Sequence, residues 1–418
     1  MANRSIVVGG GGDPALMSEL RRLRDRLGRL RETLRRGDPA GDQQTKGVQA
    51  EVEETQRRYE KVLARIRNEH PELTDFVEVR PMDPADMQRL LPEDVAVVAY
   101  YVTDVDTMVW VMRRQELIAR RIPLSRKQLG EQVHGLRRSL EQFAPVDDEL
   151  ASLYKSLIEP VAAQLSGVRA LGVIPHDALH YLPFAALLDQ SGRYLVDRFE
   201  LFSAPSVSVL EQLRQRAAFQ FGPQAGALVL GNPDRGDESL ALPFAEREAK
   251  SIGFEQPGGQ VFVGAAAQES LMHEEAGTAA YLHLACHGTF QPASPLFSSL
   301  LLAAGKEQDG DLTAIEVFSL PLSARLVTLS ACQTGLGSWE RGDELVGFNR
   351  AFLAAGAGGV LSSLWRVSDV ATAVLMKRFY RYLREDSPAG ALRKAQRLVR
   401  RYHAHPAYWA GFVLVSSW

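Results

Sequence analysis

The sequence has little cysteine and no long apolar run. Two cysteines in 418 residues are too few for a disulfide framework and fit a reducing compartment. No apolar stretch reaches the roughly 20 residues that a membrane-spanning helix needs. The opening residues, MANRSIVVGGGGDP, contain one early arginine and a very short apolar run, unlike a secretory signal. We therefore expect a cytoplasmic protein without direct membrane insertion.

The sequence also has little net charge. A formal charge of −3 gives no global electrostatic reason to bind nucleic acid or an anionic membrane, so neither partner is expected. Hydrophobic residues make up 45% and charged residues 24%, which is typical of globular proteins. A chain of 418 residues is too long for one ordinary core, so two or three domains are expected.

Residues 1–75 are predicted to form a helical hairpin. Two segments carry apolar residues at alternating spacings of four and three, the pattern of a coiled-coil seam. These residues are Leu16, Leu20, Leu23, Leu27, Leu30 and Leu34, and then Val48, Val52, Thr55, Tyr59, Val62 and Ile66. The breaker cluster GDPAGD at residues 37–42 separates them and predicts two antiparallel helices. The arginines around the first seam are interpreted as a solvated face, with a basic docking surface as the alternative.

Residues 76–220 and 221–418 each predict an α/β unit, joined by a linker at 217–225. In the first unit, strands are expected at 95–102, 107–112, 116–122, 168–174 and 198–203, and helices at 125–142, 147–165 and 206–216. In the second unit, strands are expected at 227–231, 260–263, 279–284, 296–303, 325–330, 359–364 and 408–415. Helices are expected there at 242–252, 268–276, 345–355, 368–383 and 388–401. This alternation favours a mostly parallel sheet between helical layers.

Two strands of the second unit end in reactive residues. One is YLHLACHG at 281–288, and the other is LVTLSACQTG at 326–335. Adjacent strand residues point to opposite faces, so Cys286 and His287 do not readily meet. Cys286 is therefore predicted to be a packed core residue, and His287 to pair with Cys332 across the strand ends. An imidazole beside a thiol generates a thiolate nucleophile.

The order of these motifs resembles that of the caspase/separase-like cysteine peptidases. A His-Gly strand end is followed by SACQTG at 330–335, in which Cys332 lies 45 residues after His287. The segments GDELVGFNRAFLAAGA at 342–357 and SLWRVSD at 363–369 are more specifically similar to the CHAT branch, which is widespread in bacteria. The stretch IPHDAL at 174–179 is also typical of it. The resemblance extends from residue 76 to the C-terminus.

This resemblance implies a fold and an activity. The fold would be a caspase-like three-layer α/β sandwich with a mostly parallel sheet. Residues 76–220, which lack a cysteine, would be a non-catalytic pseudo-caspase half, and 221–418 the catalytic half. The chain would be a cysteine endopeptidase that forms an acyl-enzyme, with Cys332 as nucleophile and His287 as base. The amides of Gly288 and Cys332 would form the oxyanion hole, and no metal or cofactor is expected.

The resemblance also implies a substrate and a context. Separases bind a basic P1 side chain through an acidic residue in the segment that matches 364–369, which makes Asp369 the candidate for a pocket favouring Arg or Lys. Its alternative role is the N-cap of the following helix. Trp365 is a candidate pocket wall, and Asp343 and Glu344 are rival pocket acids. A gasdermin-like pore former, an activating protein or ligand, and a bacterial antiviral defence or cell-death pathway are the expected context.

Two alternatives to a catalytic His–Cys pair stay open. His283, Cys286, His287 and Cys332 could hold zinc, but they lack the usual ligand spacing. His283 itself is either a neighbour that supports the pair or a satisfied, semi-buried residue, while His176 and His180 are interpreted as loop or packing residues. The second alternative is a non-enzymatic interaction scaffold, or pseudoprotease, that keeps the fold.

Overall fold

The computed structural model describes residues 83–217, 226–256, 258–289, 298–306, 308–330, 332–333, 344–365 and 367–418. It also describes residues 19, 22, 23, 26, 47, 48, 50–52, 54, 55, 57, 58, 61, 62 and 65. For residues 332, 333 and 344–346 it gives the course of the backbone alone. The chain folds into two compact units, residues 1–78 with 318–320 and residues 79–317 with 321–418, and each is described by itself.

The described part of the N-terminal segment is helical. Leu23, Thr55 and Val62 are its buried residues, and all three belong to the predicted seams. Arg26 donates from Nη2 to Glu51 Oε1 at 2.5 Å and so links the two predicted helices. The hairpin spanning 1–75 stays a prediction, because most of that segment lies outside the described residues.

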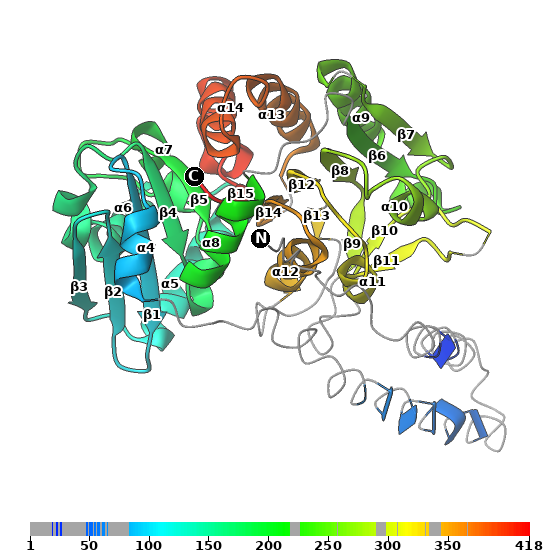
Figure 1. Ribbon diagram of the computed structural model, residues 1–418, viewed down its shortest axis with the longest axis horizontal. Coiled ribbons are helices and arrows are strands. Elements are labelled where there is room, and N and C mark those ends of the chain that lie inside the picture. Colours follow the sequence, from blue (N-terminus) through cyan, green and yellow to red (C-terminus); the bar gives the residue numbers. More distant parts are fainter. Residues whose placement is uncertain are drawn as a thin grey trace, which may run out of the picture. The chain divides into compact units, whose positions relative to one another are not determined.

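The larger unit is built on one long sheet. Among the described residues, eleven strands form this sheet. In spatial order they are β3 (Leu117–Ile122), β2 (Thr107–Met112), β1 (Val95–Val102), β4 (Ala170–Ile174), β5 (Glu200–Ser203), β15 (Phe412–Val415), β14 (Val360–Ser363), β12 (Leu326–Leu329), β8 (Tyr281–Ala285), β6 (Ala227–Pro233) and β7 (Gln260–Gly264). Figure 1 shows them fanning across the molecule.

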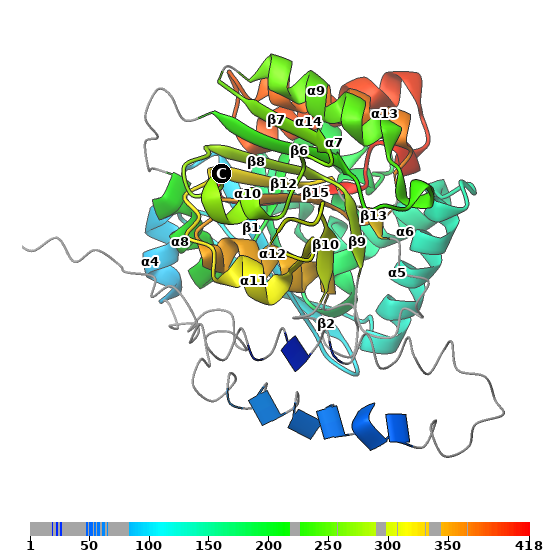
Figure 2. The same cartoon turned by 90° about the vertical axis from the view of Figure 1, so that its right-hand side faces the viewer.

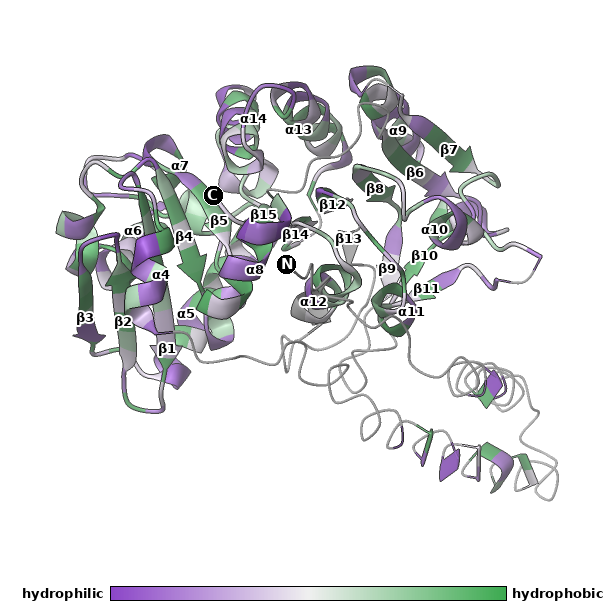
Figure 3. Ribbon diagram, in the orientation of Figure 1, coloured by the Kyte–Doolittle hydropathy of each residue, from purple (hydrophilic) through white to green (hydrophobic). Residues whose placement is uncertain are grey.

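Most neighbouring strands in this sheet are parallel. Three neighbouring pairs are antiparallel, namely β1/β2, β2/β3 and β14/β15. In every other neighbouring pair of this sheet the two strands are parallel to each other. The predicted α/β class with a large, mostly parallel sheet is therefore confirmed. The central strands read as apolar runs because helices cover both faces, and β4, β8 and β12 are almost entirely buried. Figure 3 shows hydrophobic residues predominating along β4, β6 and β8.

The C-terminal strand joins the two predicted units. β15 is parallel to β5 of the first predicted unit and antiparallel to β14 of the second. The sheet is thus continuous across the predicted boundary at residues 220 and 221, which itself lies outside the described residues. The division into 76–220 and 221–418 remains a prediction.

Helices lie on both sides of the sheet. Figure 2 shows α9 (Pro243–Glu255), α13 (Asp369–Tyr382) and α14 (Pro388–Tyr402) on one side, and α8 (Val207–Ala217) and α12 (Glu344–Ala355) on the other. α13 packs between α9 and α14. On the opposite side, Arg216 of α8 donates to the carbonyl oxygen of Ala357 at 3.2 Å. These layers confirm the predicted three-layer arrangement.

Further helices cover the first part of the sheet and connect its strands. They are α4 (Pro84–Leu90), α5 (Arg126–Glu141), α6 (Asp147–Leu157), α7 (Leu195–Arg198), α10 (Ser270–Glu274) and α11 (Ala314–Phe318). The single helix predicted at 147–165 is split, because Pro160 has no amide hydrogen to continue it, and a 3₁₀-helix follows at Glu159–Leu165. Within the described residues, no helix is both long enough and apolar enough to cross a membrane.

A smaller sheet adjoins the larger one. Among the described residues it has four strands in the order β11 (Asp311–Thr313), β10 (Ser299–Leu301), β9 (His287–Thr289) and β13 (Cys332–Gln333). β10 is antiparallel to both β11 and β9, whereas β9 and β13 are parallel. The sequence predicted 296–303 as a single strand of the second α/β unit, but the strand described within it, β10, belongs to this smaller sheet instead.

Gly231 tests the close packing of the sheet against α9. A Cβ atom at this position would lie 2.5 Å from the Cβ of Ala249 and 2.8 Å from the carbonyl oxygen of Ala245. Gly231→Ala should therefore lower the free energy of unfolding by about 1–3 kcal/mol, measured by urea denaturation. Gly130→Ala in α5 is the matched control, because a Cβ there meets nothing within 4 Å and should stabilise the helix by about 0.5–1 kcal/mol. Equal effects of the two substitutions would contradict this packing.

Candidate active site

The two reactive segments are each divided between the two sheets. β8 ends at Ala285, the chain bends at Cys286, and β9 begins at His287. β12 likewise ends at Leu329 before β13 begins at Cys332. Each segment therefore leaves the larger sheet at its carboxyl edge and enters the smaller one. This is the edge at which open α/β sheets collect functional groups.

His287 and Cys332 occupy paired backbone positions. They are register partners on the parallel strands β9 and β13, followed by the pair Gly288 and Gln333. Neighbouring strands lie about 4.8 Å apart, so the two residues are adjacent at the level of the backbone. The side chain of Cys332 lies outside the described part of the chain. The structure thus brings the predicted pair together across the strand ends, while the roles of these residues and of Gly288 stay predictions.

The imidazole of His287 is oriented by a backbone carbonyl. The side chain is half-buried, and Nε2 lies 3.1 Å from the carbonyl oxygen of Leu240. A carbonyl oxygen only accepts hydrogen bonds, so Nε2 carries the proton in this contact. In the neutral ring Nδ1 is then the basic nitrogen, and it is buried. A ring held in this tautomer is suited to accept a proton at Nδ1.

The loop after β6 positions that carbonyl. Asn232 adopts a left-handed conformation, with φ of 49°, at the end of the strand. Its Oδ1 accepts from the amide of Leu242 at 2.6 Å, and its Nδ2 donates to Glu246 Oε2 at 3.2 Å. The two contacts span the segment that contains Leu240. Asn adopts the left-handed conformation at a lower energetic cost than most other residues with a side chain, and its amide can also hold the loop through hydrogen bonds.

Arg235 ties the same loop to the smaller sheet. Its Nη1 donates to the carbonyl oxygen of Leu302 at 2.7 Å, and its Nη2 donates to Asp311 Oδ1 at 2.7 Å. Asn232, Arg235 and Leu240 were not predicted from the sequence. The signal available was NPDRG at 232–236, a turn sequence directly after a strand, where ligand-binding loops of α/β proteins lie.

Cys286 and His283 are core residues. Cys286 is a thiol at the bend and is 1% exposed, which confirms the prediction that it packs in the core. His283 is completely buried, and its Nε2 lies 2.9 Å from Glu248 Oε1, so it is a satisfied buried residue. Within the described part of the chain, no group of three or more His, Cys, Asp or Glu side chains is arranged to hold a metal ion.

The candidate pocket acids are placed in part. Asp369 is half-buried and is the first residue of α13, whereas the N-cap position belongs to Ser368. The alternative role of Asp369 as the N-cap is therefore wrong by one residue, although its carboxylate still lies where the helix dipole favours an anion. Glu344 is the first residue of α12, but its side chain lies outside the described part of the chain, as does Asp343 altogether.

Trp365 lies in the core rather than on a pocket wall. It is 2% exposed, and its Nε1 donates to the carbonyl oxygen of Ala407 at 3.1 Å. The backbone of Gly411 packs closely against the indole. The prediction that Trp365 contacts substrate is not supported, because the ring is buried against Ala407 and Gly411.

A buried arginine of the first predicted unit reaches the same strand end. Arg137 of α5 is 4% exposed and donates from Nη2 to the carbonyl oxygen of Leu364 at 2.5 Å. Its guanidinium lies 5.4 Å from the centre of the Tyr181 ring, and burial lowers its pKa. Leu364 directly precedes the segment that carries Asp369, so α5 helps to fix where that segment begins.

His176 and His180 act in packing, as predicted. His176 accepts at Nδ1 from the amide of Val102 at 3.1 Å. Burial, with the nearby cation of Arg350, lowers the pKa of His180 to about 4. His180 is therefore neutral near pH 7 and does not add charge to this region.

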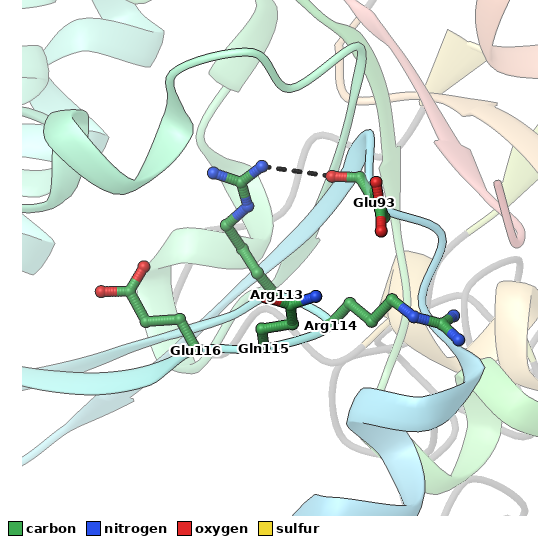
Figure 4. A pocket seen from close by; sticks show the side chains of 5 residues that line it. All are labelled: Glu93, Arg113, Arg114, Gln115 and Glu116. Atoms are coloured by element: carbon green, nitrogen blue, oxygen red, sulfur yellow. Dashed lines mark hydrogen bonds between the residues drawn. The ribbon is translucent and has the colours of Figure 1, made fainter.

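A cavity among the described residues lies elsewhere. It has a volume of about 520 Å³ and is lined by Glu93, Arg113, Arg114, Gln115 and Glu116 at the turn between β2 and β3. Figure 4 shows Arg113 reaching the carbonyl oxygen of Glu93, at 3.1 Å. Arg113 also donates to the carbonyl oxygens of Gln164 and Ser166. These contacts give Arg113 a structural role, and the sheet order puts this hollow far from β8 and β12.

Comparison with known proteins settles the family. The family model described as "CHAT domain" matches residues 147–417. The chain belongs to the CHAT-domain family. The matched region of this CHAT protein begins in α6 and ends after β15, so it includes strands from both predicted units. This agrees with a sheet that is continuous between them.

Two curated relatives are similar in sequence. The chain is 30% identical over 323 residues to human tetratricopeptide repeat protein 28, which covers 64% of this chain and 13% of the relative. It is 31% identical to the mouse protein of the same name over the same shares of both chains. The CHAT chain thus spans 13% of the length of these relatives.

Two solved structures share the fold. Both are of the Saccharomyces cerevisiae separase–securin complex, with TM-scores of 0.53 and 0.51 and sequence identities of 13% and 12%. The matches cover 79% of this chain and 31% and 30% of the other chains. This structural similarity confirms the caspase-like fold predicted from the motifs.

Asn232 tests how the loop that orients His287 is held. Asn232→Ala should remove two hydrogen bonds and strain the left-handed backbone, costing about 1–3 kcal/mol in unfolding free energy. Asn232→Gly removes the same hydrogen bonds but tolerates the backbone conformation, so it should cost less. Amide hydrogen exchange of residues 234–242 should accelerate in both variants. Unchanged exchange in Asn232→Ala would show that the side chain does not hold the loop.

Proposed function

We propose that the chain is a cysteine endopeptidase in which Cys332 is the nucleophile and His287 the general base. The observation that carries this proposal is the register pairing of the two residues, which lie just beyond the carboxyl ends of the neighbouring strands β8 and β12. Membership of the CHAT family and the caspase-like fold support it. The contact from His287 to Leu240 supports it further, because it favours the ring tautomer in which Nδ1 is the basic nitrogen.

The proposed reaction follows from these groups. Nδ1 of His287 takes the thiol proton, and the Cys332 thiolate attacks the scissile carbonyl carbon, whose oxygen becomes an oxyanion. The amides of Gly288 and Cys332 stabilise that oxyanion. The imidazolium returns the proton to the leaving amine as the C–N bond breaks, which leaves a thioester. Water, deprotonated by His287, then hydrolyses the thioester and regenerates the thiol.

The expected biological context is part of the proposal. The substrate is a polypeptide, with a gasdermin-like pore former as the expected class, and an activator protein or ligand controls cleavage. A bacterial defence or cell-death role and a cytoplasmic location stay predictions from the sequence. The two curated relatives are from human and mouse.

The second candidate is a scaffold that keeps the fold without catalysis. It is favoured by the names of the curated relatives, which refer to tetratricopeptide repeats rather than to an activity. The two functions differ in the chemistry of Cys332. A scaffold does not need an activated thiol, whereas a peptidase does.

Substitution of the proposed pair tests the activity. Cys332→Ala and His287→Ala should each reduce turnover of a fluorogenic peptide library by about 10⁴-fold or more, because the two groups act as a unit. Cys286→Ala is the matched control and should keep its turnover, since this thiol is buried at the bend. Iodoacetamide at near-neutral pH, followed by mass spectrometry, should label Cys332 faster than Cys286. Equal turnover by wild type and Cys332→Ala would exclude the peptidase, and slow labelling of both thiols would favour the scaffold.

Asp369 tests the specificity pocket. Asp369→Asn keeps the shape of the side chain but removes its charge, so it should lower kcat/KM for substrates with Arg or Lys at P1 by about tenfold to hundredfold. Substrates with a neutral P1 residue should be cleaved as before. Glu385→Gln, which removes an exposed charge beyond the other end of α13, is the control and should change neither. A basic preference that survives Asp369→Asn would remove the assignment.

A further inference from the structure

A chain of four buried polar side chains lies beneath the proposed pair. Glu248 of α9 meets His283 of β8, with Oε1 and Nε2 separated by 2.9 Å. His283 Nδ1 lies 3.3 Å from the hydroxyl of Tyr380 in α13, which in turn lies 2.9 Å from Thr328 Oγ1 of β12. His283, Tyr380 and Thr328 are completely buried, and Glu248 is 3% exposed. The contacts run from α9 to β8, from β8 to α13, and from α13 to β12.

Such a buried network destabilises the folded state unless each of its polar groups has a hydrogen-bond partner. Burying a hydroxyl or an imidazole without a partner costs about 1–3 kcal/mol, so apolar residues are the usual choice beneath a parallel sheet. Here the hydroxyl of Tyr380 has one proton and two lone pairs, which suffice for both neighbours. Burial raises the pKa of Tyr380 far above its ordinary value, so the phenol stays protonated and can donate. Satisfied buried networks of this kind fix one arrangement of the elements they join.

The network repeats the register of the proposed pair. His283 and Thr328 are register partners on the parallel strands β8 and β12. Four residues further along each segment, His287 and Cys332 are register partners on β9 and β13. The hydroxyl of Tyr380 contacts both His283 and Thr328. Four strand residues, about 13 Å of extended chain, separate this pair from His287 and Cys332. A shift of β8 or β12 along its axis would break a contact to the Tyr380 hydroxyl and would misalign His287 with Cys332.

The helices that carry the network are locked together. Gln256 donates from Nε2 to the carbonyl oxygen of Tyr380 at 3.0 Å. Arg381 pairs with Glu255, with Nη2 and Oε1 2.8 Å apart. Tyr380 lies in the last turn of α13, the helix that begins with Asp369. The phenol is thus held by α9 and α13 while it contacts β8 and β12.

We propose that Tyr380 is a positioning residue, whose hydroxyl holds β8 and β12 in register and thereby sets the spacing of His287 and Cys332. The structural part of this proposal, that the hydroxyl holds the two strands in register, depends only on the hydrogen-bond network. Its catalytic part rests on the proposed peptidase function. The two parts call for separate measurements, so that the failure of one is not mistaken for the failure of the other.

Tyr380→Phe removes one hydroxyl and keeps the ring. In the full chain, amide hydrogen exchange of residues 281–289 and 326–333 should become about threefold to tenfold faster, because the strands lose a shared contact. Thr328→Val removes the other hydroxyl and should give the same result, with little added effect in the double variant. Tyr100→Phe is the matched control. Tyr100 is also buried, and its hydroxyl donates to the carbonyl oxygen of Leu157 at 3.0 Å, in the first predicted unit.

Turnover gives the second measurement. Tyr380→Phe should lower kcat by roughly tenfold to hundredfold with little change in KM, because misalignment affects the reacting groups rather than substrate contacts. Tyr100→Phe should leave both constants unchanged despite a comparable loss of stability. Equal kcat values for the two variants would overturn the catalytic part.

The outcomes are distinguishable. Exchange of 281–289 and 326–333 that is the same in Tyr380→Phe as in wild type and Tyr100→Phe would overturn the proposal, whatever the activity. A wild-type protein that cleaves no peptide would remove the proposed function, and the exchange measurement would then decide the structural role of Tyr380 by itself. Thermal unfolding of each variant shows whether a change is local or reflects a general loss of the fold.

Discussion

The candidate site depends on the parallel pairing of β8 with β12. Parallel neighbours present their carboxyl ends at the same edge of a sheet, so whatever follows each strand emerges side by side. The pairing runs from Tyr281 with Leu326 to Leu284 with Leu329, and the amide of Ser330 continues it to the carbonyl oxygen of Leu284. β9 and β13 begin from this fixed edge. The proximity of His287 and Cys332 is therefore set in the core before any site residue contributes.

Residues that depend on local periodicity could be predicted from the sequence, and those that depend on distant contacts could not. Apolar runs marked β8 and β12, and the residues after them marked the strand ends. β9 and β13 are three and two residues long, too short to show a period, so the second sheet was missed. Leu240 and Arg137 reach the site from loops and helices far away in the chain, and no spacing reveals them. The position of Trp365 in its motif predicted a pocket wall, but the structure buries the ring in the core.

The same distinction explains the two predicted α/β units. Alternating strands and helices show that a sheet forms, but they do not show which strands are neighbours. β15, the last strand in the sequence, lies between β5 and β14, so the order of the chain and the order of the sheet differ most at this point. Arg137 makes a second link by holding the carbonyl oxygen of Leu364. The first predicted unit is thus joined to the second at the strand that leads to Asp369, which gives it a direct structural role beside the candidate site.

Two different interactions constrain the proposed pair, and they act at different scales. The carbonyl oxygen of Leu240 orients one ring, whereas the network from Glu248 to Thr328 aligns two whole strands. Apolar side chains of similar volume often stabilise a core as well as a buried ionisable pair does, so stability alone does not explain His283 and Glu248. Directional contacts add uniqueness, because a hydrogen bond of 2.9 Å tolerates little sliding while apolar packing tolerates more. A site whose chemistry needs two backbone positions in register gains more from such alignment than from additional burial.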